Sequence, residues 1–277
     1  MEKRDLQTDV PTGETNLLQI VRSKLHVFRL TYVLSAVAVT IAFLWPPLEV
    51  AAYLRFRAGQ WFIARTFHKI IATMLGLNIS VKGQPAPSRP LLVIANHVSW
   101  LDIVAISSML PAIFVTQHGV ASWPVFGRLA KLSPSIFVNR DRKREVLQTI
   151  NHISDALGAD DVVAIFPEGT STDGMAVLPF RSALLGAVRE TLHKAEDLRA
   201  VHVQPVSVRY AGPNRRLAAW AREDDSSFFS HLLQVIRLRR IDVTLRWEAP
   251  IPADIQADRK ALARTLEQTI RRSAAQG

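Results

Sequence analysis

The longest apolar segment of the chain lies between Arg29 and Glu49 and reads LTYVLSAVAVTIAFLWPPL. Its 19 residues carry no charge, and at about 1.5 Å per helical residue they extend roughly 28 Å, close to the ~30 Å hydrocarbon core of a bilayer. Pro46 and Pro47 are expected to end the helix, which leaves about 24 Å of uninterrupted helix from Leu30 to Trp45. The segment is therefore expected either to span the bilayer or to dip into one leaflet.

The surroundings of this segment favour a retained membrane element over a cleaved signal peptide. The residues before it include four acids, at Glu2, Asp5, Asp9 and Glu14, whereas a signal peptide begins with a short basic region. After it, aromatic residues interleave with cations as far as Gly76, as is typical of a membrane interface. Because basic residues flank the segment on both sides, the positive-inside rule assigns no orientation, and a hairpin within one leaflet accounts for this symmetry. We expect residues 1–80 to form a membrane-associated helical region.

The charge balance indicates polyanionic partners. Lysine and arginine total 34 against 24 acidic residues, a formal net charge of +10, which favours anionic lipid or nucleic acid. No helix-turn-helix, RNA-recognition or zinc signature occurs, so we expect membrane lipids as partners and no nucleic acid. The chain has no cysteine and no HExxH motif, and we expect neither thiolate chemistry nor a metal site.

From about Gly76 the pattern changes, because short β-rich runs now alternate with helical patterns. Strands are predicted at Leu91 to Ala95, Ile113 to Thr116, Ser135 to Val138, Val162 to Phe166, Val201 to Val208 and Ile241 to Trp247. Helices are predicted at Leu101 to Met109, Lys143 to Leu157, Ser182 to Ala195 and Arg259 to Arg272. This alternation predicts an α/β domain over residues 81–277, with a largely buried sheet flanked by helices. Gln84 to Pro90 is the expected linker between the two regions.

A histidine and an aspartate follow the first of these strands. His97 stands at the carboxyl end of the run Leu91 to Ala95, and Asp102 comes five residues later, at the start of a predicted helix. In such a turn a carboxylate can hold one imidazole nitrogen while the other accepts a proton from a hydroxyl, as a general base does. An ordinary polar turn has the same spacing.

Two further polar clusters also follow predicted strands. In Phe166 to Thr170, sequence FPEGT, the Glu168 carboxylate can accept hydrogen bonds from a substrate hydroxyl or hold a cation, although an ordinary strand-to-helix loop has the same pattern. Asn139 to Arg144 holds four cations in five residues. Arg140 is the candidate phosphate ligand there, and the rest is interpreted as a solvated face.

In this order the clusters resemble the sequence blocks of the lysophospholipid acyltransferases of the 1-acylglycerol-3-phosphate acyltransferase type. The first block, NHxSWxD with its HX4D motif, is similar to Asn96 to Asp102. The other blocks are an apolar strand ending in arginine, FPEGT, and a proline in a strand; they are similar to Ile136 to Arg140, Phe166 to Thr170 and Val203 to Val206. The resemblance covers roughly Val81 to Val208, and apolar amino-terminal helices are also typical of the family.

The resemblance implies an acyltransferase-type α/β sheet and a membrane-bound enzyme. It would move an acyl chain from acyl-ACP or acyl-CoA, as co-substrate and without a further cofactor, to the free hydroxyl of a lysolipid. His97 is implied to deprotonate that hydroxyl while Asp102 orients and charges the imidazole. Arg140 and the turn of Glu168, Gly169 and Thr170 are implied to bind the acceptor head group. The expected location is the bacterial inner membrane, with the catalytic domain on the cytoplasmic side.

The residue after FPEGT bears on the acceptor. Family members that use lysophosphatidic acid usually have arginine there, whereas this chain has Ser171. Arg181 can replace that cation, so the acceptor stays open. A 1-acyl-sn-glycerol-3-phosphate acceptor, giving phosphatidic acid, is the first expectation because glycerophospholipids are the broader class. The alternative is lyso-ornithine lipid, because TSxDG followed by VLPF, here Thr170 to Phe180, resembles the branch that makes ornithine lipid.

Functions of other classes stay open. A non-catalytic lipid-binding protein could share the fold, although it would not need both His97 and Asp102. A serine hydrolase is disfavoured because no G-x-S-x-G motif is present. The segment Asn214 to Arg240, which mixes Trp220, Phe228 and Phe229 with arginines, is either an interface-binding or acceptor-gating element or a simple excursion between strands.

Overall fold

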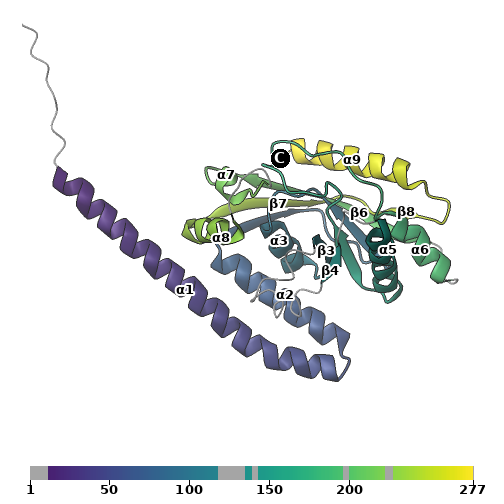
Figure 1. Ribbon diagram of the computed structural model, residues 1–277, viewed down its shortest axis with the longest axis horizontal. Coiled ribbons are helices and arrows are strands. Elements are labelled where there is room, and N and C mark those ends of the chain that lie inside the picture. Colours follow the sequence, from purple (N-terminus) through teal and green to yellow (C-terminus); the bar gives the residue numbers. More distant parts are fainter. Residues whose placement is uncertain (1–11, 118–134, 139–142, 196–199, 222–226, 277) are drawn as a thin grey trace, which may run out of the picture.

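The computed structural model describes residues 12–117, 135–138, 143–195, 200–221 and 227–276. Within these ranges a long helical hairpin lies along one side of an α/β domain (Figure 1). The hairpin consists of α1 (Thr12–Tyr53) and α2 (Arg57–Met74). The domain contains a mixed sheet with helices on both faces, which confirms the expected α/β class.

The sheet is formed, in the described part of the chain, by eight strands in the order β1-β7-β6-β2-β5-β3-β4, with β8 pairing with β6. Their bounds are β1 (Leu77–Lys82), β2 (Leu91–Ala95), β3 (Ile113–Gln117), β4 (Ser135–Val138), β5 (Val162–Ile165), β6 (Val201–Ala211), β7 (Ile241–Trp247) and β8 (Ile251–Ala253). Strands β6, β2, β5, β3 and β4 run parallel to their neighbours in this order, whereas β7 is antiparallel to β6. The carboxyl ends of β2 and β5 therefore lie at the same edge, where loops can meet.

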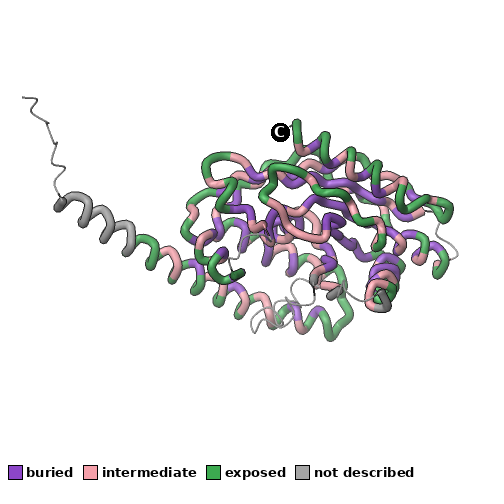
Figure 2. Tube along the Cα trace, turned by 45° about the horizontal axis from the view of Figure 1, so that its top comes forward, coloured by how far each residue is buried: buried purple, intermediate pink, exposed green. Residues whose placement is uncertain are grey.

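Helices cover both faces of this sheet. Besides α1 and α2 they are α3 (Leu101–Met109), α5 (Lys143–Gly158), α6 (Gly186–Lys194), α7 (Arg215–Ala218), α8 (Phe228–Arg237) and α9 (Arg259–Ala275). One core contains buried residues of α2, α3 and α8, and the other contains buried residues of α5, α6 and α9. Figure 2 shows that buried residues concentrate in the domain, whereas most of the described part of α1 is exposed or half-buried.

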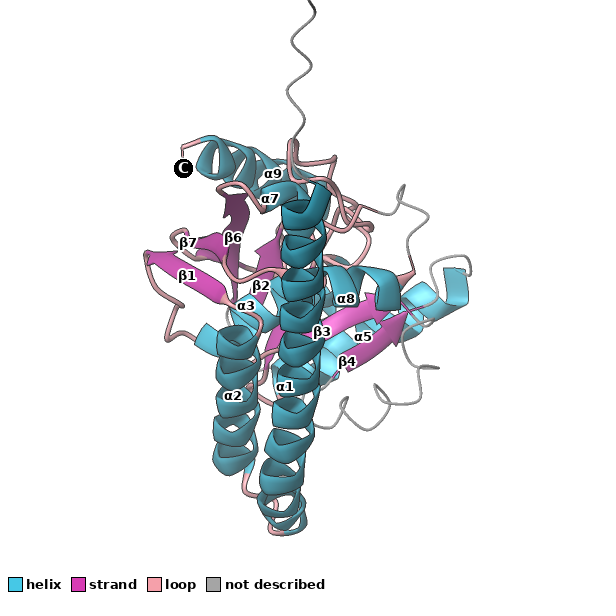
Figure 3. Cartoon of the chain, turned by 90° about the vertical axis from the view of Figure 1, so that its left-hand side faces the viewer, coloured by secondary structure: helices cyan, strands magenta, loops and turns pink. Residues whose placement is uncertain are grey.

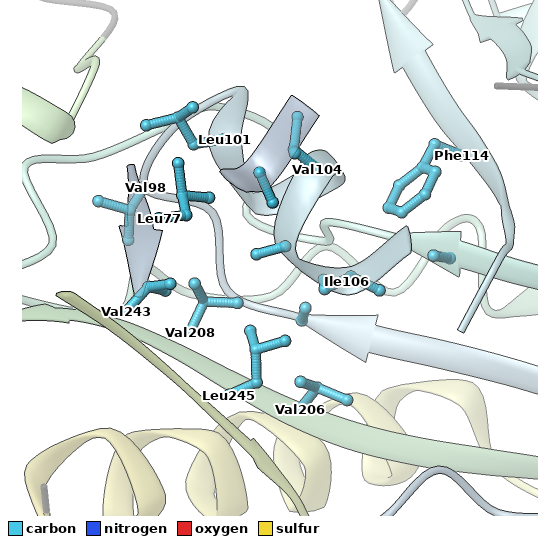
Figure 4. Close-up of a cluster of buried hydrophobic side chains, with 14 of the residues drawn as sticks. Leu77, Val98, Leu101, Val104, Ile106, Phe114, Val206, Val208, Val243 and Leu245 are labelled. Atoms are coloured by element: carbon cyan, nitrogen blue, oxygen red, sulfur yellow. The ribbon is translucent and has the colours of Figure 1, made fainter. Parts of the chain in front are cut away.

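Strand β2 is covered on both faces of the sheet. All five of its residues are buried, and Leu91, Val93 and Ala95 contribute to one core while Leu92 and Ile94 contribute to the other. Side chains of a strand alternate between the two faces, so a continuous apolar run is needed where both faces are covered. Figure 4 shows the core on the α3 side, where Leu101, Val104 and Ile106 lie above Val206, Val208 and Leu245.

The expected break of the first helix at Pro46 and Pro47 is wrong, because α1 continues through both prolines to Tyr53. Beyond the prolines Leu48 and Ala51 are buried, and α1 contacts α2 along its length. Tertiary packing stabilises a helix more than local propensity does, so it outweighs the missing amide donors. The helix ends instead at Tyr53, two residues before Arg55, which has a φ of 54°. There the amides of Arg55 and Phe56 donate to Ala52 and Ala51 carbonyls, which is a Schellman motif.

The predicted strands and helices are all present. Four further elements, β1, β8, α7 and α8, were not predicted. β1 includes the expected region boundary between residues 80 and 81, and it pairs in parallel with β7. The expected linker, Gln84 to Pro90, joins β1 to β2 and is tied to Gln204, which accepts a hydrogen bond from the Ala86 amide at 2.8 Å. The helix expected from Ser182 begins at Gly186, because the Arg181 amide bonds to the Pro167 carbonyl.

Candidate active site

The loop after β2 is held to the neighbouring strand by Asn96. The Asn96 side chain donates to the Val208 carbonyl at 2.9 Å and accepts from the Val208 amide at 2.7 Å. Because β2 and β6 are parallel neighbours, these two bonds continue the pairing one step beyond the strand. His97 thus leaves the sheet at a defined position, at the carboxyl end of β2.

His97 and Asp102 are in direct contact, as the sequence predicts. The Nδ1 atom of His97 lies 2.8 Å from Oδ2 of Asp102. An ionised carboxylate only accepts hydrogen bonds, so Nδ1 carries the proton and Nε2 presents a lone pair. Asp102 is completely buried, whereas the His97 side chain is 21% exposed. Within the described residues no partner occupies Nε2, which is the arrangement a general base requires.

Further donors stabilise the Asp102 carboxylate. Oδ2 also accepts from the amides of Val98 at 2.7 Å and Ser99 at 3.0 Å, because Asp102 stands in the first turn of α3 and faces back toward the loop. Charge-assisted bonds of this kind offset the cost of burying a carboxylate. The turn thus holds the Asp102 carboxylate in place, and the carboxylate orients the His97 imidazole.

Tyr210 completes this site, and sequence reasoning missed it. Its hydroxyl donates to Oδ1 of Asp102 at 2.7 Å from the end of β6, 108 residues away along the chain. Burial, followed by the Asp102 charge, raises the pKa of Tyr210 well above its usual value of 10, so the hydroxyl remains a donor. No local motif of the sequence includes Tyr210. Its contact with Asp102 arises because β2 and β6 are neighbours in the sheet.

The plane of the imidazole is set by an aromatic ring. Phe166, the residue after β5, stacks on His97 with 4.2 Å between ring centroids and 15° between planes. Phe166 in turn stacks on Phe114 of β3 at 5.9 Å. Stacking on one side and the Asp102 bond on one edge leave the ring little rotational freedom.

Glu168 binds backbone groups on both sides of the site. Its Oε1 accepts from the His97 amide and its Oε2 from the Leu178 amide, each at 2.7 Å, and the residue is only 3% exposed. Burial raises its pKa, and the two amide bonds lower it in part. The carboxylate thus joins the FPEGT loop to the loop that carries His97. A contact of Glu168 with the acceptor stays a prediction.

The rest of the FPEGT loop wraps around His97. Gly169 has a φ of 78°, a left-handed conformation that favours glycine, and its amide bonds to the Phe166 carbonyl at 3.1 Å. Thr170 is half-buried beside it. The Thr172 amide donates to the His97 carbonyl at 3.0 Å. Gly169 and Thr170 therefore lie in the turn next to the histidine, and their binding of a head group stays a prediction.

Of the two predicted arginine ligands, Arg140 lies outside the described residues. Arg181 is exposed, and its amide donates to the Pro167 carbonyl at 2.9 Å, which places its backbone beside the FPEGT loop. In the described ranges, no group of three or more His, Cys, Asp and Glu side chains could hold a metal ion.

The segment between β6 and β7 contacts the loop that carries His97. Ser171 donates from its hydroxyl to the Trp220 carbonyl, and the Trp220 amide donates to the Val98 carbonyl at 2.9 Å. Trp100 donates from its indole to Nδ1 of His231 at 3.0 Å, so Nε2 of His231 donates to the Ala219 carbonyl at 3.0 Å. The Ser171 hydroxyl thus already has an acceptor within the protein.

Comparisons with known proteins agree with this geometry. A family model described as Acyltransferase matches residues 78–209. The lyso-ornithine lipid O-acyltransferase of Rhizobium meliloti (strain 1021) is 35% identical over 237 residues, which cover 83% of this chain and 80% of that protein. The enzyme of the same name from Brucella abortus (strain 2308) is 37% identical over 213 residues, covering 74% and 79%.

Two further similar proteins have a different acceptor in their names. The 1-acyl-sn-glycerol-3-phosphate acyltransferase of Neisseria gonorrhoeae is 29% identical over 204 residues, covering 73% of this chain and 76% of that protein. The crystal structure of the 1-acyl-sn-glycerophosphate (LPA) acyltransferase PlsC from Thermotoga maritima superposes with a TM-score of 0.68 at 19% identity, covering 92% of this chain and 97% of that chain. The expected acyltransferase-type fold is thereby confirmed.

Proposed function

Because the chain belongs to the acyltransferase family, we propose that this enzyme acylates the free hydroxyl of lyso-ornithine lipid, using a thioester as acyl donor. Its lysolipid acyltransferase activity follows from the family. The observation that carries the mechanism is the contact of His97 Nδ1 with Asp102 Oδ2 at 2.8 Å, which leaves Nε2 as the imidazole nitrogen that can take a proton.

The proposed reaction needs only one proton carrier. Nε2 of His97 takes the proton from the lysolipid hydroxyl. At the same time the hydroxyl oxygen bonds to the carbonyl carbon of the thioester. The carbon–sulfur bond then breaks, and the leaving thiolate takes the proton from Nε2. Asp102 stabilises the positive charge that the imidazole carries between these steps. The acyl donor is acyl-ACP or acyl-CoA, and no acyl-enzyme forms.

The choice of acceptor rests on two observations. Identity to lyso-ornithine lipid O-acyltransferases reaches 35% and 37%, against 29% for the Neisseria gonorrhoeae enzyme. Ser171 stands where users of lysophosphatidic acid usually have arginine, and its hydroxyl bonds to Trp220. These observations move lyso-ornithine lipid ahead of glycerophosphate, the first expectation from the sequence. The second candidate acceptor is 1-acyl-sn-glycerol-3-phosphate, because the alignment with the Neisseria gonorrhoeae enzyme covers a similar share of both chains.

The packing of α1 supports a placement within one leaflet. Residues 24–53 of α1 are apolar and long enough to cross a membrane. The mean hydropathy over an 18-residue stretch of them is 2.0, and 11% of that stretch is buried. Val33, Leu48 and Ala51 are buried, and α1 contacts α2 and α8, so one side of the helix packs on the protein while its other sides can contact lipid. Its exposed apolar side would lie in the membrane interface. We assign the catalytic domain to the cytoplasmic side of the bacterial inner membrane, where acyl carriers are available.

Acyl transfer by membranes that contain the protein tests this function. Labelled acyl-ACP or acyl-CoA is supplied with either lyso-ornithine lipid or lysophosphatidic acid, and product is measured for the native chain, His97→Ala and His152→Ala. His152 is an exposed histidine of α5, so its replacement is the matched control. We expect ornithine lipid from the native chain and the control only. Transfer by His97→Ala at the native rate would refute the general base, and preferred use of lysophosphatidic acid would refute the acceptor.

A further inference from the structure

Helix α8 exposes apolar side chains on the side that faces away from the domain. Phe228, His231 and Val235 point into the protein and are buried. On the other side, Phe229 is 54% exposed and Leu233, one turn later, is 41% exposed. The outer side of a helix that faces water is normally polar. This stripe is therefore a candidate contact surface.

Helix α7 extends the stripe and adds positive charge. Leu217 of α7 is 43% exposed, and its carbonyl accepts from Gln234 of α8 at 3.0 Å, which joins the two helices. Arg215, Arg216, Arg237 and Arg239 are exposed around these apolar residues. Large apolar side chains ringed by arginines suit a bilayer with anionic lipid, because the guanidinium groups reach phosphates while the apolar groups enter the interface.

The surface is continuous with the apolar helix α1. The guanidinium of Arg29 donates to the carbonyls of Ile236 and Leu238 at the end of α8. Phe28 and Tyr32, which flank Arg29, are 71% and 58% exposed. Figure 1 places α8 at the edge of the domain along which α1 runs, and Figure 3, which looks at this side, shows α8 beside α1. A bilayer that contacts α1 here therefore reaches α8.

The same segment contacts the catalytic loop. The bond from Trp100 to His231 attaches α8 to the turn that carries His97, and the bond from the Trp220 amide to Val98 attaches the residues after α7. We propose that Leu217, Phe229 and Leu233, with the arginines around them, form a second membrane-binding surface that holds an anionic bilayer beside His97. This inference rests on the membrane placement of α1 proposed above.

Fluorescent labelling at single sites tests this surface separately from α1. The chain has no cysteine, so Phe28→Cys, Leu233→Cys and Leu147→Cys can each carry one environment-sensitive dye. Leu147 is the matched control, since it is a 62% exposed leucine of α5, on the other face of the sheet. The probe is a phosphatidylcholine vesicle with about 30% phosphatidylglycerol.

We expect dyes at positions 28 and 233 to become immersed, with blue-shifted emission and quenching by lipid-attached spin labels, and the dye at position 147 to stay in water. An immersed dye at 28 with an aqueous dye at 233 would overturn the second surface and leave the placement of α1 intact. Aqueous dyes at both positions would refute the placement of α1 as well.

The arginines are tested by the double variant Arg215→Glu/Arg216→Glu in the Leu233→Cys background. We expect loss of immersion at position 233 on anionic vesicles and little change on neutral ones. The acidic protein carrier of the acyl chain is the other partner that such charges could serve. If the variant instead raised KM for acyl-ACP in neutral detergent micelles while position 233 stayed immersed on anionic vesicles, the lipid assignment of these arginines would be overturned.

Discussion

Replacement of Tyr210 by phenylalanine removes one hydroxyl from the site and keeps the ring in the core. The lost bond is the one to Oδ1 of Asp102 at 2.7 Å, and a hydrogen bond to a charged group contributes about 1.5–3 kcal/mol. Oδ2 keeps its three donors, so the Asp102 side chain stays in place and the protein should fold. We expect the free energy of unfolding to fall by about that amount.

The effect on catalysis follows from the same bond. Each 1.36 kcal/mol of transition-state stabilisation changes the rate tenfold. If the whole energy of this bond is lost from the transition state, kcat should fall by about 10-fold to 100-fold. KM for the lysolipid should be unchanged, because the Tyr210 side chain is buried beneath Asp102 and does not reach the substrate. Initial rates of acyl transfer at varied acceptor concentration measure both constants, and urea unfolding in detergent micelles measures stability.

Ser207→Ala is the matched control for general loosening of β6. Ser207 is a buried hydroxyl three residues from Tyr210, and it bonds to Ser273 of α9 at 2.9 Å, far from Asp102. We expect this variant to lose stability and keep kcat. A Tyr210→Phe protein with reduced stability and an unchanged kcat would refute the positioning role and leave Tyr210 as a purely structural residue.

The remaining predictions concern charge and acceptor choice. Asp102→Asn retains one oxygen as an acceptor and removes the charge, so kcat should fall by about 10²-fold to 10⁴-fold; a kcat above a tenth of native would contradict the mechanism. Glu168→Gln leaves one of two amides without an acceptor, which should cost about 1–3 kcal/mol in urea unfolding. Because burial raises the pKa of Glu168, its contribution to stability is full below the unfolded pKa of about 4.5 and is lost as the pH rises through the folded pKa, and Glu168→Gln should remove this slope. Ser171→Arg should break the bond to Trp220 and raise kcat/KM for lysophosphatidic acid relative to lyso-ornithine lipid; an unchanged ratio would show that this position does not select the acceptor. Burial lowers the pKa of His68 in α2 to about 4 from 6.5, so stability present above pH 6.5 should fall by about 3 kcal/mol as the pH drops to 4, and unfolding of His68→Gln should lack this loss.

Most elements of the sheet were predictable because their signals are local. Runs such as Leu91 to Ala95 are apolar throughout, and a strand covered on both faces needs such a run. The first helix was mispredicted at Pro46 because proline is a local signal against helix, whereas the contacts that sustain α1 come from α2 and α8. The short strand β8 and helix α7 exist through their neighbours, and no window of sequence reveals them.

The contact of His97 with Asp102 was predictable for the same reason, because six consecutive residues of sequence contain both partners. This contact, the α/β class and the apolar amino-terminal segment can all be read from the amino-acid sequence. Three other features depend on the folded chain: Tyr210 supports Asp102, Glu168 holds two loops together, and α8 contacts both α1 and the turn that carries His97. The physical reason is that these contacts join residues far apart along the chain, and only the pairing of β2 with β6 and the packing of helices on the sheet bring them within hydrogen-bond distance.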